Sequence, residues 1–258
     1  MTVNAEYLER YARHIMLKEI GGPGQKRLSD ATVLIVGMGG LGCPASLYLA
    51  AAGAGRLVIM DDDVVSRSNL QRQVLFGEAD VGRAKVEAAS EKLRAINPAL
   101  QVDALPRRIG ADDVPDLPPG ALVLDGCDNF ATRFAVNDIC HARGLKLVSG
   151  AVGAWMGQVS VYASGVTKDL PVERRLPCYR CLTPDIPETE ENCAEIGVIG
   201  PLTGIVGARM ALEAVKEITG AGDTMAGRLW LFDGLTGETR TVGLPRDPAC
   251  PVCGQAPR

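Results

Sequence analysis

The chain has 258 residues, of which 47% are hydrophobic and 4% aromatic, and its formal net charge is −4. This apolar content is ample for a buried core, whereas the charge provides no basic surface of the kind that DNA or RNA requires. The sequence shows no apolar run of about 20 residues that could cross a membrane and no basic-then-apolar leader. We therefore expect a cytoplasmic protein that binds neither membranes nor nucleic acids.

Residues 1–30 are predicted to form an N-terminal helical arm. Apolar side chains recur at helical spacing over residues 4–20, and Gly21-Gly22-Pro23-Gly24 is expected to end that helix. Short apolar runs then alternate with helical patterns, which is typical of a parallel, doubly wound, Rossmann-like α/β sheet. The expected strands are 32–36, 56–60, 102–105, 122–124 and 145–149, and the expected helices are 45–52, 85–96 and 132–142.

After residue 150 the pattern changes. A strand is expected over 158–162, a polar, proline-containing loop over 168–192, and a helix over 204–218. Two short apolar runs, 229–232 and 239–242, flank a turn sequence and predict a hairpin. We expect these antiparallel strands to extend the parallel sheet, so that residues 1–258 form one domain with halves 31–150 and 151–258.

A glycine-rich turn, with Gly37, Gly39, Gly40 and Gly42, connects the first strand to the next helix. Glycines let the backbone approach a phosphate closely, and a helix N-terminus favours negative charge. Asp61 ends the second strand, 19 residues past Gly42, where a ribose hydroxyl would be held. Taken alone, this arrangement fits NAD, FAD or ATP, and it favours NAD.

Three charged residues next to this turn shift the prediction to ATP. Arg72 follows the second strand in a polar segment, Lys85 begins a helix, and Asp128 ends the fourth strand. Ligands bind at the carboxyl ends of parallel strands in this architecture. Cations and a carboxylate suit a triphosphate with Mg²⁺, whereas hydride transfer needs none of them. Surface ion pairs are the alternative interpretation of each residue singly.

Two Cys-x-x-Cys pairs, Cys178/Cys181 and Cys250/Cys253, are separated by 68 residues. In a cytosolic chain such pairs are metal ligands more often than disulfides, and four thiolates form a closed, structural Zn²⁺ site. Independent free thiols are the alternative, and a redox pair is disfavoured because neither pair is expected to begin a helix after a strand. The cysteines expected to be small buried residues are Cys43, Cys127 and Cys140.

Nearly the whole chain resembles the MoeB/ThiF/HesA family of adenylyltransferases, which are bacterial relatives of the ubiquitin-activating enzymes. The resemblance extends from Arg10-Tyr11-Ala12-Arg13-His14 to Cys250-Pro251-Val252-Cys253-Gly254, and the set of motifs in this order is highly specific. The segments between them that match are Gly37 to Gly42, Asp61-x-Asp63, Ser68-Asn69-Leu70-Gln71-Arg72-Gln73, Lys85, Asp128-Asn129, Pro177-Cys178-Tyr179-Arg180-Cys181 and Gly197-Val198-Ile199-Gly200-Pro201.

The resemblance implies that MgATP binds at the glycine turn. Asp61 would hold the ribose, Asp128 would bind Mg²⁺, and the phosphates would contact Asn69, Arg72 and Lys85. The matching segments also place further residues in this site: Asp63, Ser68, Leu70, Gln71 and Asn129.

The substrate implied by the resemblance is the C-terminal Gly-Gly carboxylate of a ubiquitin-like sulfur carrier, bound by residues 151–258. It would attack the α-phosphorus to give an acyl-adenylate and pyrophosphate, for a molybdopterin, thiamin or related thiocarboxylate pathway. Arg13 resembles an arginine that reaches the ATP site of the other subunit, which implies a homodimer. Cys193 resembles a cysteine that some members use in sulfur transfer, but its acidic neighbours disfavour a thiolate. A sulfurtransferase or cysteine desulfurase would supply the sulfur.

Three other functions remain open at this point. An NAD(P)-dependent oxidoreductase would need only the glycine turn and Asp61. A non-catalytic scaffold could bind the carrier without using Arg72, Lys85 and Asp128. Adenylation of another carboxylate, on a modified tRNA base or a peptide, would use the same nucleotide site, although the lack of a basic face disfavours tRNA.

Overall fold

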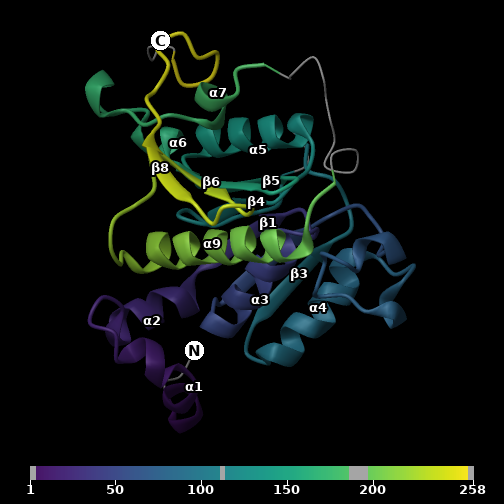
Figure 1. Ribbon diagram of the computed structural model, residues 1–258. Coiled ribbons are helices and arrows are strands. Elements are labelled where there is room, and N and C mark those ends of the chain that lie inside the picture. Colours follow the sequence, from purple (N-terminus) through teal and green to yellow (C-terminus); the bar gives the residue numbers. More distant parts are fainter. Residues whose placement is uncertain (1–3, 111–113, 186–196, 255–258) are drawn as a thin grey trace.

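An eight-stranded β-sheet forms the centre of the computed structural model, which describes residues 4–110, 114–185 and 197–254 (Figure 1). The strand order is β3-β2-β1-β4-β5-β6-β7-β8. Strands β1 to β5 are parallel, and β6 to β8 continue the sheet antiparallel. This confirms the predicted fold class. The strands are β1 (Thr32–Val36), β2 (Arg56–Met60), β3 (Gln101–Leu105), β4 (Leu122–Asp125), β5 (Lys146–Gly153), β6 (Met156–Tyr162), β7 (Arg228–Asp233) and β8 (Thr239–Gly243).

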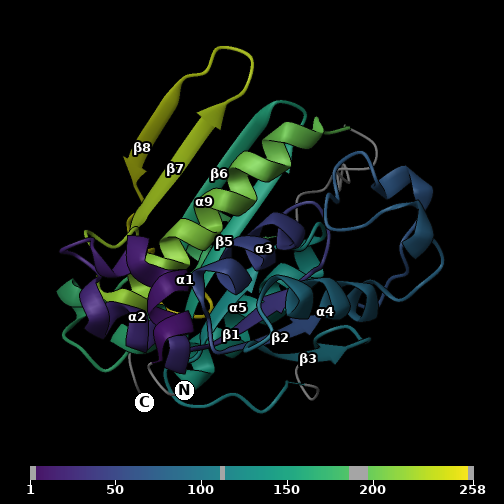
Figure 2. The same ribbon diagram turned by 90° about the horizontal axis from the view of Figure 1, so that it is seen from below.

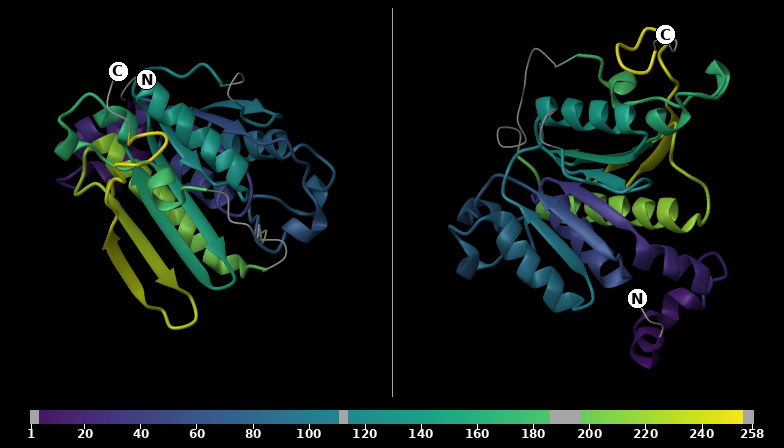
Figure 3. Two further views of the ribbon diagram at one scale, coloured as in Figure 1. Left: turned by 90° about the horizontal axis from the view of Figure 1, so that it is seen from above. Right: turned by 180° about the vertical axis from the view of Figure 1, so that it is seen from behind.

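Helices cover both faces of the sheet. Helices α3, α4 and α9 pack on one face, and α5, α6 and α7 lie on the other (Figures 1 and 3). No helix in the described ranges is both long and apolar enough to cross a membrane. The helices are α1 (Ala5–Ile15), α2 (Gly21–Asp30), α3 (Gly42–Ala52), α4 (Lys85–Ile96), α5 (Phe130–Arg143), α6 (Ser164–Thr167), α7 (Tyr179–Leu182) and α9 (Gly200–Thr219).

The covering helices explain why β1 is a continuous apolar run. Val33 and Ile35 belong to the core beneath α3, α4 and α9, whereas Leu34 and Val36 belong to the core beneath α5. A strand that is buried on both faces has no position for a polar side chain. The antiparallel strands are covered less completely, and the β7–β8 hairpin extends beyond the helices in Figure 2.

The parallel strands end together at one edge of the sheet. Their register pairs Val36 of β1 with Met60 of β2 and Asp125 of β4, and Met60 with Leu105 of β3. From the neighbouring strands β1 and β4, the chain continues through α3 on one face and through α5 on the other. Such a switch point leaves a crevice at the carboxyl ends of the strands.

Helix α1 packs at the opposite, amino edge of the sheet. Its buried Tyr11 lies against Gly53, and the Tyr11 hydroxyl accepts a hydrogen bond from Asn97 Nδ2 at 3.1 Å. Gly53 and Asn97 end α3 and α4 shortly before β2 and β3 begin. The N-terminal arm is therefore held at the amino ends of these strands.

Two predicted segments differ in the structure. Residues 4–20 do not form one helix, because α1 ends at Ile15 and Gly21 begins α2 instead of ending a helix. Gly21 adopts a left-handed φ of +56°, and Pro23 lies in the first turn of α2, where no amide hydrogen is needed. The expected loop over 168–192 contains a 3-10 turn and α7 in its described part, and residues 186–192 lie outside the described residues.

Candidate active site and metal centre

A pocket lies at the carboxyl edge of the sheet, where the loops after β1, β2, β3 and β4 meet. It brings together the glycine turn, the acidic residues after β2, and the separately predicted Arg72, Lys85 and Asp128. Val198, which precedes α9, and Thr203, in the first turn of α9, line it as well. Residues that are widely spaced in the sequence therefore share one site at the switch point.

The glycine turn has a structural side and an open side. Gly37 has a φ of +91°, and a Cβ on Gly42 would lie 1.9 Å from the Gly37 carbonyl oxygen. Gly39 lines the pocket, and the nearest atom to a Cβ there would be the Gln73 amide nitrogen at 3.8 Å. The turn leads into α3, whose N-terminal amides and dipole favour an anion. Gly37 and Gly42 thus build the turn, while Gly39 leaves room for a ligand.

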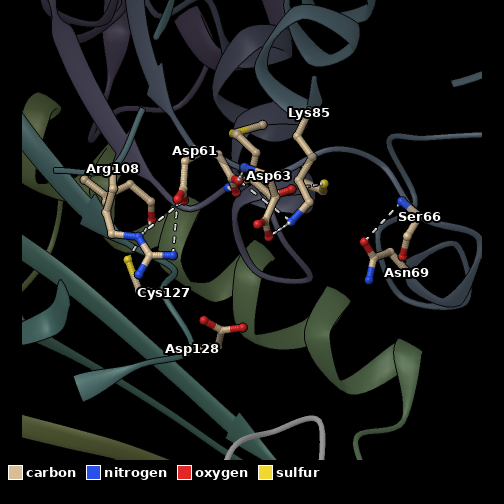
Figure 4. Close-up of polar contacts among 12 residues, drawn as sticks. Asp61, Asp63, Ser66, Asn69, Lys85, Arg108, Cys127 and Asp128 are labelled. Carbon is tan, nitrogen blue, oxygen red and sulfur yellow. Dashed lines mark hydrogen bonds and ion pairs between the residues drawn. The ribbon is translucent and has the colours of Figure 1, made fainter. Parts of the chain in front are cut away.

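Asp61, Asp63 and Lys85 form a charged cluster beside this turn (Figure 4). Lys85 Nζ lies 2.8 Å from Asp63 Oδ2 and 3.8 Å from Asp61 Oδ1, and the lysine side chain is only 6% exposed. Asp61 also accepts a hydrogen bond from the Met38 amide at 2.7 Å. Burial raises the pKa of Asp61 above its usual value, and the charge of Lys85 opposes this shift. Asp61 is thus a partly desolvated acceptor that suits a hydroxyl donor.

Arg72 and Gln73 reach the pocket from a loop that α9 holds in place. The Thr203 hydroxyl of α9 lies 3.3 Å from the Arg72 carbonyl oxygen and 2.7 Å from the Gly200 carbonyl oxygen, and it can donate its one proton to either. A Cβ on Gly200 would lie 2.3 Å from the Gln71 carbonyl oxygen, so the start of α9 packs closely on this loop. Within the described residues, the Arg72 guanidinium donates only to Ser68 O, at 3.3 Å. Gln73 is 3% exposed, and its Oε1 accepts no hydrogen bond from any described residue. The Arg72 guanidinium and the buried Gln73 amide therefore both face the pocket, and both can form further hydrogen bonds with a ligand.

Asp128 enters the pocket from the loop between β4 and α5, across an open space from Asp61 and Lys85 (Figure 4). It is exposed, and the next residue, Asn129, caps α5 by accepting a hydrogen bond from the Thr132 amide at 2.9 Å. Within the described residues, Lys85 forms salt bridges with Asp61 and Asp63 and none with this carboxylate. The Asp128 carboxylate has the oxygen ligands that Mg²⁺ prefers.

Several predicted site residues lie outside the pocket lining. Ser68, Asn69, Leu70 and Gln71 precede Arg72 around the 3-10 turn, and Figure 4 shows Asn69 apart from the charged cluster. Their contacts with a nucleotide stay predictions. Arg13 is exposed on α1 at the amino edge of the sheet, away from its own pocket, and Cys193 lies outside the described residues.

Sequence reasoning missed the loop after β3. Arg107, Arg108 and Ile109 line the pocket, and the Arg108 guanidinium lies 3.2 Å from Asp62. The sequence could have predicted them, because charged residues follow this strand just as they follow β2 and β4. Thr203 had no local signal, since only the tertiary fold brings α9 to the pocket. Cys127 also lines the pocket, although burial raises its pKa well above the usual range.

The four paired cysteines meet at one place. Their Sγ atoms lie within 4.8 Å of one another, with Cys178 to Cys250 at 3.5 Å and Cys181 to Cys253 at 3.3 Å. Tetrahedral zinc–thiolate bonds of about 2.3 Å place the sulfurs about 3.8 Å apart, so these residues could hold such an ion. Cys178 is the N-cap of the four-residue α7, but a 3-10 turn and not a strand precedes it, so the first pair does not begin a helix after a strand.

Comparisons with known proteins identify the family of this chain. A model of the ThiF family matches residues 11–252. The chain belongs to the ThiF family. A ThiF-family relative from Haloferax volcanii, named SAMP-activating enzyme E1, is 42% identical over 258 residues, which are 99% of this chain and 92% of the relative. The sulfur carrier protein ThiS adenylyltransferase of Escherichia coli is 44% identical over 246 residues, 95% of this chain and 94% of that protein.

A solved structure shares the fold. The crystal structure of Escherichia coli MccB with ATP superposes with a TM-score of 0.79 over 95% of this chain and 75% of that one. The two sequences are 24% identical, so this likeness concerns the fold alone.

Proposed function

We propose that this chain uses MgATP to adenylate the C-terminal Gly-Gly carboxylate of a small ubiquitin-like sulfur carrier. The observation that carries the proposal is the meeting of Arg72, Lys85 and Asp128 with the glycine turn in one pocket. A triphosphate with Mg²⁺ needs such charges, whereas hydride transfer to a nicotinamide needs none of them. The names of relatives at 42% and 44% identity support a sulfur carrier as substrate.

The pocket suggests how the nucleotide would lie. Asp61 would accept hydrogen bonds from the ribose, and the backbone at Gly39 and Gly40 would face the phosphates. Arg72 and Lys85 would neutralise phosphate charge, with Asn69 and its neighbours Ser68, Leu70 and Gln71 beside them. Asp128 would hold Mg²⁺ with Asn129 beside it and Asp63 across the pocket, and the bound ion would supply further charge neutralisation at the phosphate oxygens.

The reaction needs no nucleophile from this protein. A carboxylate oxygen of the carrier forms a bond to the α-phosphorus, and the bond from that phosphorus to the bridging oxygen breaks. Pyrophosphate leaves with that electron pair, and the acyl-adenylate remains. The chain's own residues would align the two reactants and stabilise the charge that develops on the phosphate oxygens, and both effects lower the barrier substantially.

A homodimer would give Arg13 a role in this reaction. Helix α1 is held at the amino edge of the sheet by Tyr11, while the pocket lies at the carboxyl edge. Five-residue strands separate the two edges by about 16 Å, so exposed Arg13 could serve only the pocket of another copy. Mixing Arg13→Ala chains with Asp128→Asn chains should restore activity, because one pocket of the mixed dimer would be intact. No restoration after subunit exchange would exclude the shared pocket.

The remaining parts of the proposal concern metal, sulfur and location. The four cysteines would hold a structural Zn²⁺, and the whole chain would act as one adenylation unit because its pocket uses residues from both halves. A sulfurtransferase or cysteine desulfurase would supply sulfur, with Cys193 as the candidate for a covalent role. We place the reaction in the cytoplasm, where cysteine thiols stay reduced.

Carrier-dependent exchange of labelled pyrophosphate into ATP would test the proposal. Wild-type protein should catalyse exchange only when a carrier ending in Gly-Gly is present, and Asp128→Asn should reduce it by about 100-fold. Asp30→Asn is the matched control, since this exposed residue lies on α2 at the amino edge of the sheet. No exchange with any encoded carrier, or full exchange by Asp128→Asn, would refute the proposal. Tight NADH binding without ATP binding would favour the oxidoreductase.

A further inference from the structure

Arg133 is a buried cation that joins the ends of two strands to the loop that carries Asp128. Its side chain is 8% exposed and lies in the first turn of α5. One guanidinium nitrogen donates to Asp125 Oδ2 and Ser149 Oγ, both at 3.2 Å, and the other donates to Gly150 O at 2.9 Å and to Cys127 O. A cation near a helix N-terminus is disfavoured by the helix dipole, so these acceptors account for its position.

The contacts of Arg133 fix the backbone on one side of Asp128. The Cys127 amide donates to Asp125 Oδ1 at 3.0 Å, and the Cys127 carbonyl accepts from Arg133. On the other side, Asn129 is fixed as the cap of α5. Among the described residues, the Asp128 carboxylate accepts one side-chain hydrogen bond, a long one of 3.5 Å from Asn129 Nδ2. Its direction is therefore set by the two residues that flank it.

Tyr179 connects this arrangement to the four-cysteine centre. It lies directly after Cys178, is 4% exposed, and has its ring centroid 6.0 Å from the Arg133 guanidinium carbon. Its amide donates to Asn137 Oδ1 on α5 at 2.7 Å. A guanidinium against an aromatic face is attracted to the ring and kept in place by it.

The next residue of the cysteine loop holds α5 as well. Arg180 lies 3.0 Å from Asp138 Oδ2, and its guanidinium carbon is 4.1 Å from the centroid of the Phe134 ring. The two residues between Cys178 and Cys181 thus contact four positions along α5. A metal that fixes this loop would also fix the helix that carries Arg133.

We propose that Arg133 and Tyr179 are positioning residues, which transmit the rigidity of the four-cysteine centre to Asp128. This inference rests on the proposed function insofar as Asp128 is taken to hold Mg²⁺. Loss of the Tyr179 ring would let Arg133 turn away from Cys127 O, and Asp128 would then point in more directions. Binding that depends on Mg²⁺ would weaken, while binding of AMP, which needs no ion at Asp128, would not.

The test compares nucleotide affinities of the full-length, zinc-loaded protein by calorimetry. Mg²⁺ raises the affinity for ATP, and Tyr179→Leu should make this increase about tenfold smaller, the effect of a small misplacement of a charged group. The affinity for AMP should stay unchanged. Tyr179→Phe keeps the ring and is the matched control, with wild-type behaviour expected. In an Asp128→Asn background, Tyr179→Leu should cause less than a twofold further change, because it acts through Asp128.

A second variant covers the case in which Tyr179→Leu loses zinc or unfolds. Arg133→Lys keeps the charge without the forked geometry, so it should show the same selective loss with zinc content retained. The inference is overturned if Arg133→Lys keeps the full gain in ATP affinity from Mg²⁺, or if AMP affinity falls as much as MgATP affinity. It is also overturned if Tyr179→Leu and Asp128→Asn together reduce MgATP affinity by the product of their separate effects. Normal MgATP binding without carrier-dependent exchange would refute the proposed function but leave this inference standing.

Discussion

Two alanine substitutions in the glycine turn should separate its folding role from its binding role. A Cβ on Gly42 would lie 1.9 Å from the Gly37 carbonyl oxygen and 3.0 Å from the carbonyl carbon. Non-bonded carbons prefer about 3.5–4.0 Å, so the turn would have to move by more than about 1 Å. Overpacking of this severity costs about 3 kcal/mol. At about 2–4 °C per kcal/mol for a chain of this size, Gly42→Ala should lower the melting temperature by roughly 6–12 °C.

Gly39→Ala should have the opposite profile. Its Cβ would meet nothing closer than 3.8 Å, so the free energy of unfolding should change by less than about 0.5 kcal/mol. The methyl group would occupy the side of the turn that faces the pocket, and ATP affinity should fall at least roughly tenfold, about 1.4 kcal/mol. Differential scanning calorimetry and ATP titration of both variants give the answer. An unchanged melting temperature for Gly42→Ala, or normal ATP affinity for Gly39→Ala, would refute this reasoning.

Three further predictions concern a ligand contact, the metal and pH. Gln73→Leu should weaken ATP binding roughly fivefold, which corresponds to about one hydrogen bond. Thermal stability should not fall, because Gln73 Oε1 has no described hydrogen-bond partner to lose. A loss of stability with intact ATP binding would contradict this prediction. Cys253→Ser should abolish stoichiometric zinc in elemental analysis and destabilise the chain by more than about 3 kcal/mol, whereas Cys140→Ser should retain zinc. A hydrogen bond from Lys92 lowers the pKa of buried Asp80 below its ordinary 3.8, so Asp80 stabilises the fold above that pH and ceases to do so as pH falls through its folded pKa. Unfolding midpoints of wild-type and Asp80→Asn proteins should therefore differ at pH 7 and converge in strong acid.

Local chemistry predicted most of the sheet and the charged part of the pocket around the glycine turn. Strands that are buried on both faces, such as β1, consist of continuous apolar runs, and polar residues that bind ligands follow their carboxyl ends. Asp61 and Asp128 were found in this way. The break between α1 and α2 was missed because Gly21 and Pro23 fit the start of a helix as well as its end.

The rest of the site depends on contacts between distant segments. Thr203 reaches the pocket only because α9 packs on β5, β6 and α3. The partners of Arg133 are spread over β4, β5 and the loop after β4. The spacing of residues in the sequence does not predict which acceptors a buried guanidinium binds. The contact between Arg133 and Tyr179 is therefore known only from the folded structure.

The wide separation of the two cysteine pairs has a consequence for how the protein is made. Ribosomes add about 5–20 residues per second, so the 68 residues between Cys181 and Cys250 take about 3–14 s to synthesise. During this interval only the first pair of the four-cysteine centre, Cys178 and Cys181, has been made, and the α5 face that their loop contacts is already translated. If the four cysteines hold zinc, as proposed, zinc limitation in a growing cell would act first on newly made chains, whose α5 would then lack the contacts of a metal-bound loop.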